Sequence, residues 1–220
     1  MSLDFHLQVV NLLAAVLLLI AFAMLSQRRI VGLITLFAWQ GAALATSTAL
    51  VAWSTGQHHL YYSAALTLGL KVILMPWYFF RLIRQLDVNR EVEPMINIPT
   101  TMLIGIGLVI FAFNLALPIA EMAGTVTRST LGIALASVLL AFLMMITRSK
   151  AIPQVIGFLA MENGLFFAAT SATYGMPLVV ELGVALDVLV AVFVLGIFFF
   201  HIRETFDSLD LKHMERLRDK

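Results

Sequence analysis

Cysteine is absent from this chain of 220 residues, and charged residues are scarce. The lack of cysteine excludes disulfides, thiolate zinc sites, iron–sulfur clusters and a cysteine nucleophile, so we expect any redox centre to lie elsewhere, on another subunit. Charged residues make up 12% of the sequence, whereas soluble domains carry roughly 25%. With a net charge of +1 and no basic stripe, the sequence gives no indication of a nucleic-acid partner.

Hydrophobic residues, in contrast, are abundant and make up 61% of the chain. They gather in about seven runs, each long enough to cross a hydrocarbon core of ~30 Å as a helix. A strand barrel is disfavoured, because the runs are about twice the length that a spanning strand needs and do not alternate in polarity. The sequence therefore predicts an all-α, polytopic membrane helix bundle. The expected spans are about 7–25, 31–53, 60–82, 99–120, 129–146, 153–173 and 177–200.

Basic residues follow the first, third, fifth and seventh expected spans, so all of them fall on one side if the spans alternate in direction. The opposite side carries only Arg128. By the positive-inside rule, we expect the amino terminus outside and the carboxy terminus in the cytoplasm. The residues that set this orientation are Arg28, Arg29, Arg81, Arg84, Arg90, Arg148, Lys150, Arg203, Lys212, Arg216, Arg218 and Lys220.

The long polar segment from Arg84 to Pro99 divides the chain. We expect an N-terminal three-helix membrane region over 1–98, which contains Lys71, and a C-terminal four-helix region over 99–200. A cytoplasmic tail follows over 201–220.

Ionisable residues inside the expected spans are the main functional signal. Lys71, Glu162 and Asp187 each lie about ten to twelve residues into a span, close to the midplane, whereas Glu181 is nearer the outer surface. A central charge costs ~2.5–3.5 kcal/mol on insertion scales, so these residues should face the bundle interior and pair. They fit a proton relay, and the structural alternative is a set of inert ion pairs that lock the helices together.

The neighbours of these charges add detail. Pro76 leaves the carbonyl of Val72 without its usual helical partner and predicts a kink close to Lys71. Directly after Glu162, Asn163 can bond across helices and Gly164 permits close helix approach. Gln40, taken alone, is interpreted as a polar contact that holds helices together.

The chain resembles the hydrogenase-4 component E family through three motifs. They are residues 156–164 (IGFLAMENG), residues 178–187 (LVVELGVALD) and the 71–76 stretch with Lys71, Leu74 and Pro76. The resemblance covers essentially the whole chain. It implies a non-catalytic membrane subunit of a complex-I-like group 4 [NiFe]-hydrogenase, a class that includes formate hydrogenlyases.

The last three expected spans are similar to the K-type subunit of respiratory complex I and to the C-type subunit of multisubunit cation/proton antiporters. Asp187 falls close to the acidic residue of the final K-type helix. Leu159 occupies the position of the K-type glutamate, and Glu162 lies one turn later on nearly the same face.

This resemblance implies a part in a proton-translocation path that is coupled to redox chemistry on a peripheral arm. Glu162 and Asp187 would be proton carriers, Lys71 their charge partner, and Glu181 a link toward the outer side. The implied partners are antiporter-like and H-type-like membrane subunits and a peripheral [NiFe]/iron–sulfur arm, in a bacterial or archaeal cytoplasmic membrane. We expect no catalytic, cofactor-binding or metal site on this chain, which would be one part of an oxidoreductase complex.

Two other functions stay open. The chain could belong to a cation/proton antiporter without a redox arm, which would use the same acidic residues, or could be a structural scaffold in the membrane, which would not need them. An autonomous transporter is disfavoured because the spans show no inverted pair of repeats. A separate enzyme is disfavoured because no phosphate loop, nucleophile elbow or ligand cluster is present in the sequence.

Overall fold

A computed structural model of the full chain describes residues 2–86, 94–123 and 128–173. The chain divides into two compact units, Met1–Leu182 and Gly183–Lys220, and every described residue belongs to the first. The expected seventh span over 177–200, with Glu181 and Asp187, and the tail over 201–220 lie outside the described residues.

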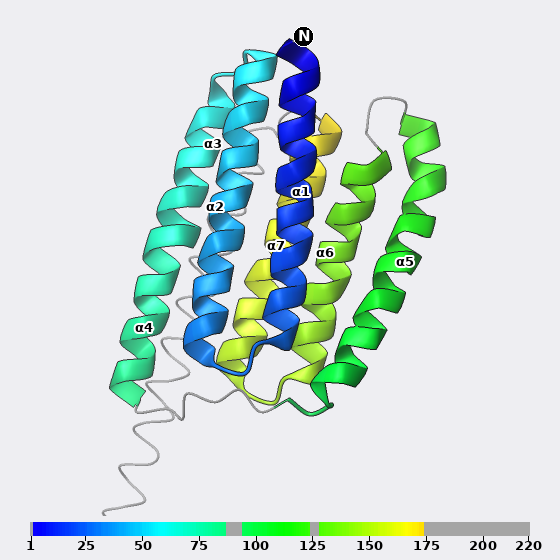
Figure 1. Cartoon of the computed structure of the whole chain (residues 1–220). Coiled ribbons are helices and arrows are strands. Elements are labelled where there is room, and N and C mark those ends of the chain that lie inside the picture. Colours follow the sequence, from blue (N-terminus) through cyan, green and yellow to red (C-terminus); the bar gives the residue numbers. More distant parts are fainter. Residues whose placement is uncertain (1, 87–93, 124–127, 174–220) are drawn as a thin grey trace, which may run out of the picture. The chain divides into compact units, whose positions relative to one another are not determined.

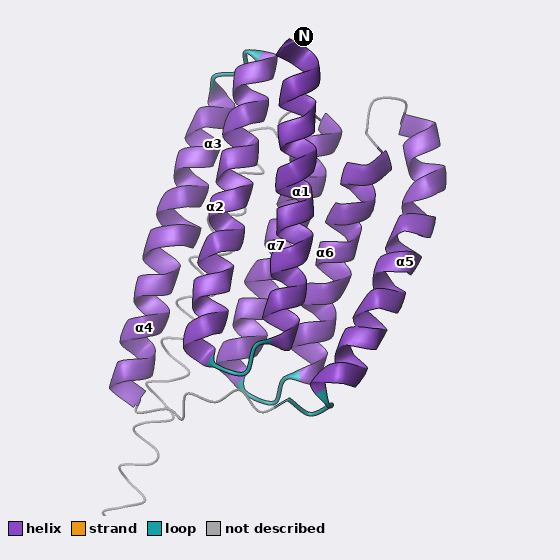
Figure 2. Cartoon of the chain, viewed as in Figure 1, coloured by secondary structure: helices purple, strands orange, loops and turns teal. Residues whose placement is uncertain are grey.

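The described part of the chain consists of helices, with short loops at residues 27–29, 56–58 and 148–150 (Figure 2). The third helical run is continuous but changes its winding, because a π-helical segment separates two α-helical pieces. The elements are α1 (Ser2–Ser26), α2 (Ile30–Thr55), α3 (His59–Thr67), η1 (Leu68–Leu74), α4 (Met75–Leu86), α5 (Ile98–Ala123), α6 (Arg128–Thr147) and α7 (Ala151–Thr173).

Among the described residues, six helices are long and apolar enough to cross a membrane. They coincide with the first six runs predicted from the sequence, so the chain is a multi-pass membrane protein whose described part is an all-α helix bundle. The seventh span and the sidedness of the termini stay predictions. The six candidate spans are Gln8–Ser26, Ile30–Thr55, His59–Arg84, Ile98–Pro118, Thr130–Thr147 and Ala151–Thr170.

The helices pack side by side as a bundle (Figure 1). Helix α6 lies between α5 and α7, and α1 contacts α2, α5 and α6. Helix α2 contacts α1, α3, η1 and α7, so helices from the 1–98 region pack directly on helices from the 99–200 region. Large apolar side chains such as Leu19 (71% exposed) and Leu103 (70% exposed) face outward, as expected for a surface solvated by lipid.

Close packing of α7 on α6 depends on Gly164. A Cβ atom at this position would lie 2.9 Å from Cγ2 of Val138 and 3.1 Å from its backbone nitrogen. The glycine next to the acidic motif therefore permits the close helix approach that the sequence predicts. Gly107 on α5 differs, because a Cβ atom there would meet nothing within 4 Å.

Arg148, directly after α6, holds the end of α1 and the following loop against α6 through side-chain hydrogen bonds. Its side chain is buried, and its Nη2 donates hydrogen bonds to the carbonyl oxygens of Leu25 at 2.7 Å and Gln27 at 3.0 Å. The Leu25 carbonyl lies in the last turn of α1, where helical partners are lacking, and the Gln27 carbonyl lies in the loop directly after it. The backbone N–H of Met95 donates to the carbonyl of Thr147 at 2.9 Å and attaches the segment before α5 to the same place. Burial lowers the pKa of the Arg148 guanidinium from its usual high value.

Candidate functional site

Buried polar side chains in the bundle find their hydrogen-bond partners either within their own helix or on another helix. The hydroxyls of Thr48, Ser137 and Thr170 donate to carbonyls four residues earlier in their own helices, at 3.0, 2.9 and 3.0 Å. Such bonds occupy the polar group without joining helices. A second set of buried polar side chains has partners on other helices and forms the candidate site: Gln40, Lys71, Glu162 and Asn163.

Lys71 stands in the middle of η1 and is only 3% exposed. The sequence predicts a kink in the helix close to Lys71, and the structure has a π-helical segment there, directly before Pro76. At its end the Met75 N–H donates to the carbonyl of Leu70, five residues earlier. Single-turn π segments inside helices are frequent at functional sites. The lysine that carries the buried charge therefore occupies the one stretch of its span, among the described residues, where α-helical winding is interrupted.

Gly41 on α2 lets that helix lie close against the backbone of Lys71. A Cβ atom at Gly41 would be 3.2 Å from Cβ of Lys71 and 3.3 Å from Cγ2 of Val72. These distances are tighter than ordinary van der Waals contact. The absence of a side chain at Gly41 thus sets the separation of α2 and η1, beside which the lysine stem runs toward α7.

The Lys71 ammonium makes two contacts with consecutive residues of α7. It lies 3.4 Å from Oε2 of Glu162, and it donates a hydrogen bond of 2.7 Å to Oδ1 of Asn163. Glu162 is 9% exposed and Asn163 is 1% exposed, so both contacts are made inside the bundle. The carboxylate compensates the charge of the lysine, while the amide supplies the shorter bond.

Asn163 extends the network to a third element. Its Nδ2 donates to Oε1 of Gln40 on α2 at 3.2 Å. The Asn163 amide therefore uses its oxygen toward η1 and its nitrogen toward α2. Buried networks of this kind hold a specific arrangement of helices, because each amide loses a partner if the helices shift.

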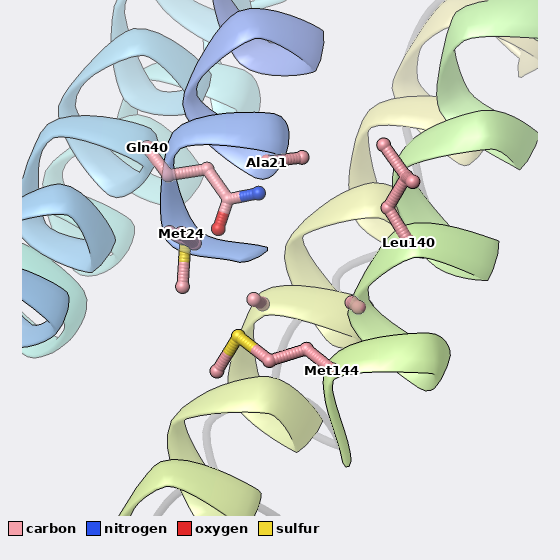
Figure 3. A pocket seen from close by; sticks show the side chains of 7 residues that line it. Ala21, Met24, Gln40, Leu140 and Met144 are labelled. Atoms are coloured by element: carbon pink, nitrogen blue, oxygen red, sulfur yellow. The ribbon is translucent and has the colours of Figure 1, made fainter. Parts of the chain in front are cut away.

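A small cavity borders the network on the side of Gln40, whose amide projects toward it (Figure 3). Its volume of about 10 Å³ is at the lower limit for one water molecule. Apart from Gln40, the described residues that line it are apolar, so the cavity alone is not a hydrated channel. The lining residues are Ala21, Met24, Gln40, Leu140, Ala141, Met144 and Ala160.

The structure brings together Lys71 and Glu162, two of the four predicted proton-path residues. Glu162, and not Leu159 one turn earlier, contacts the lysine, and Leu159 is fully buried. Glu181 and Asp187 lie outside the described residues. In the part of the chain that the structure describes, histidines and acidic residues form no cluster of three that could hold a metal ion.

Gln40 is the member of the network that the sequence interpretation missed as part of the site. Taken alone, a glutamine in a span indicates no more than a polar contact between helices. One signal could have identified it: Gln40 lies near the middle of its span, at a depth similar to that of Lys71 and Glu162.

Comparison with known proteins gives two kinds of relative. The uncharacterized protein Rv0085 of Mycobacterium tuberculosis strain H37Rv is 35% identical over 211 residues, which cover 96% of this chain and 96% of the relative. Hydrogenase-4 component E of Escherichia coli K12 and of Shigella flexneri is 24% identical over 148 residues, which cover 67% of this chain and 68% of the relative. No family model and no solved structure matches the chain.

Proposed function

Because this chain belongs to the family of the Mycobacterium tuberculosis protein Rv0085 and is similar to hydrogenase-4 component E, we propose that it is a non-catalytic membrane subunit of a hydrogenase-4-type complex. In this proposal it contributes buried charged residues to a proton-translocation path. The redox chemistry takes place on a peripheral [NiFe]/iron–sulfur arm that other chains provide, and the complex resides in a bacterial or archaeal cytoplasmic membrane.

The observation that carries the proposal is the buried Lys71–Glu162 pair, held by Asn163. A pair of unit charges 3.4 Å apart attracts by about 5 kcal/mol at an effective dielectric constant of 20. Protonation of Glu162 removes this attraction, so the position of the proton is coupled to the charge near Lys71. Ionisable residues placed inside membrane spans are the usual components of proton relays.

The roles that we propose follow from this coupling. Glu162 takes up and releases the proton, and Lys71 stabilises its anionic state. Asp187 is the next carrier, as the K-type resemblance of its helix implies, and Glu181 links the path toward the outer side. Antiporter-like and H-type-like membrane subunits continue the path beyond this chain.

The test measures proton movement by the assembled complex in sealed vesicles, with a pH-sensitive dye, after the changes Glu162→Gln and Asp187→Asn. We expect the variant complex to assemble and to lose proton movement. The matched control is Asn114→Ala, since this exposed amide on α5 bonds to the Ile110 carbonyl of its own helix at 2.8 Å and should leave proton movement unchanged. Full proton movement in the doubly changed complex would overturn the proposed path and leave a scaffold role.

Gentle purification of the native protein tests the hydrogenase assignment separately. We expect subunits that carry nickel and iron–sulfur centres to copurify with this chain. Copurification with antiporter-like subunits alone, without nickel or iron–sulfur, would contradict the hydrogenase assignment and favour a cation/proton antiporter.

A further inference from the structure

A groove with a volume of about 370 Å³ runs along one face of α4, and the proposed proton path does not use it. Its lining residues are Trp77, Phe80, Arg81 and Arg84. Their spacing of three and four residues places all of them on the same side of the helix. The groove thus combines an aromatic half with a cationic half one turn further along α4.

Stacking on Trp77 orients the cationic half of the groove, and no described residue that lines the groove carries a compensating charge. The guanidinium of Arg81 lies over the Trp77 ring, with its carbon 5.5 Å from the ring centroid. Trp77 is 55% exposed, and both arginines are exposed. The described residues that line the groove include no carboxylate. Two guanidinium groups therefore face outward and can donate to an anion.

The depth of the groove matches the boundary between acyl chains and headgroups. Lys71 lies near the middle of the span His59–Arg84. Arg81 follows about ten residues later, roughly 15 Å further along the helix, which is about half the thickness of a hydrocarbon core. Arg81 and Arg84 then lie at the level of lipid phosphates, and Trp77 lies beside the part of the acyl chains that is nearest the headgroups.

From this geometry we propose that the groove binds one anionic phospholipid. Its phosphate oxygens accept hydrogen bonds from Arg81 and Arg84, and its glycerol and acyl chains lie along Trp77 and Phe80. Guanidinium groups bind phosphate oxygens with two parallel hydrogen bonds, and an adjacent aromatic ring holds the cation in place. A lipid is favoured over an acidic protein segment because the aromatic half of the groove lies at acyl-chain depth.

The test uses the full purified chain in detergent, incubated with equal amounts of phosphatidylglycerol and phosphatidylcholine and examined by native mass spectrometry. We expect one phosphatidylglycerol to remain bound in preference to phosphatidylcholine. The change R81Q/R84Q should weaken this binding about 30-fold, which corresponds to ~1 kcal/mol for each arginine near the membrane surface.

The matched control is R28Q/R29Q. It removes the same charge from exposed arginines between α1 and α2, which do not line the groove, and it should leave phosphatidylglycerol binding unchanged. Two further variants keep the proposal testable if R81Q/R84Q does not fold. W77L keeps both charges but removes the ring that orients Arg81. R81K/R84K keeps the charges but removes the planar guanidinium groups that can donate two parallel hydrogen bonds. Each variant should weaken phosphatidylglycerol binding by several-fold.

Three results would overturn the proposal. One is an equal loss of phosphatidylglycerol in R81Q/R84Q and R28Q/R29Q, which would show a general attraction to positive charge. Another is equal retention of the two lipids by the unchanged chain, as expected if an acidic protein segment fills the groove. The third is unchanged binding in both W77L and R81K/R84K.

Discussion

Lys71 donates a hydrogen bond of 2.7 Å to Asn163, which lies 92 residues further along the chain. This bond is shorter than the 3.4 Å separation between the ammonium and the Glu162 carboxylate. Because an amide does not titrate, Lys71 keeps a polar partner in either protonation state of Glu162. The arrangement lets the carboxyl group change its charge without leaving the lysine unsolvated.

The first prediction compares the two members of the ion pair. Lys71→Met removes the cation that faces the Glu162 carboxylate, and loss of one partner from a buried pair costs about 3–5 kcal/mol. Glu162→Gln also removes the charge attraction, but the glutamine keeps the shape of the side chain and Asn163 still accepts a hydrogen bond from Lys71, so we expect a smaller loss. The free energy of unfolding in mixed micelles, followed by circular dichroism, measures both.

The double variant K71M/E162Q provides the control for this comparison. We expect it to recover part of the stability lost in K71M, because no carboxylate then remains opposite the missing lysine. Equal destabilisation by K71M and E162Q would contradict the separate role that we assign to Asn163.

The second prediction concerns the bond between Asn163 and Gln40. Gln40→Leu removes the acceptor for Asn163 Nδ2 and should destabilise the bundle by about 0.6 kcal/mol, the average for hydrogen bonds between membrane helices, and by at most about 1.7 kcal/mol. Asn114→Leu serves as comparison, because its exposed amide bonds within its own helix. Thermal unfolding in detergent should show a lower Tm for the Gln40 variant than for the Asn114 variant; the reverse order would be inconsistent with a network between helices.

The third prediction concerns glycine positions. Gly164→Ala forces the added Cβ atom against the side chain and backbone of Val138, and overpacking of this kind costs about 1–3 kcal/mol. Gly107→Ala adds the same atom where nothing lies within 4 Å. We expect the first variant to unfold at a lower denaturant concentration than the second. Equal unfolding midpoints would show that α6 and α7 separate easily.

The fourth prediction concerns Arg148. Arg148→Met leaves the carbonyls of Leu25 and Gln27 without their charged donor, and hydrogen bonds to a charged group contribute about 1.5–3 kcal/mol each. We expect a lower Tm and faster amide hydrogen exchange at the end of α1. Arg28→Gln, at an exposed position after the same helix, should leave both unchanged. Unaltered exchange at Leu25 and Gln27 in the Arg148 variant would refute this fastening role.

The sequence predicts the spans well because long apolar runs in lipid can hardly adopt any other form. It also places Lys71 and Glu162 at similar depth, since depth follows from position along a helix. It could not show that their side chains meet, because the rotation of each helix and the choice of neighbours depend on packing. The network through Gln40 is a product of that packing.

The π-helical segment was beyond prediction for a different reason. Pro76 indicates an irregular helix, but both a kink and a π-helical segment can accommodate proline, which has no backbone N–H. The sequence does not decide between the two, and in the structure the π-helical segment is the stretch that lies close against α2 at Gly41. The same limitation applies to Gly164, where the sequence indicates a close approach but not the helix that makes it.

The long interval in the chain between Lys71 and its partners has a consequence for biogenesis. Ribosomes add about 5–20 residues per second, so the third span leaves the ribosome roughly 5–20 seconds before Glu162 and Asn163 exist. During this time the newly made segment holds a lysine at membrane depth with no α7 beside it. Until α7 is made, the cost of ~2.5–3.5 kcal/mol for a central charge must be offset by the apolar residues of the third span itself. The contact that joins η1 and α7 in the finished bundle is therefore absent while the third span inserts.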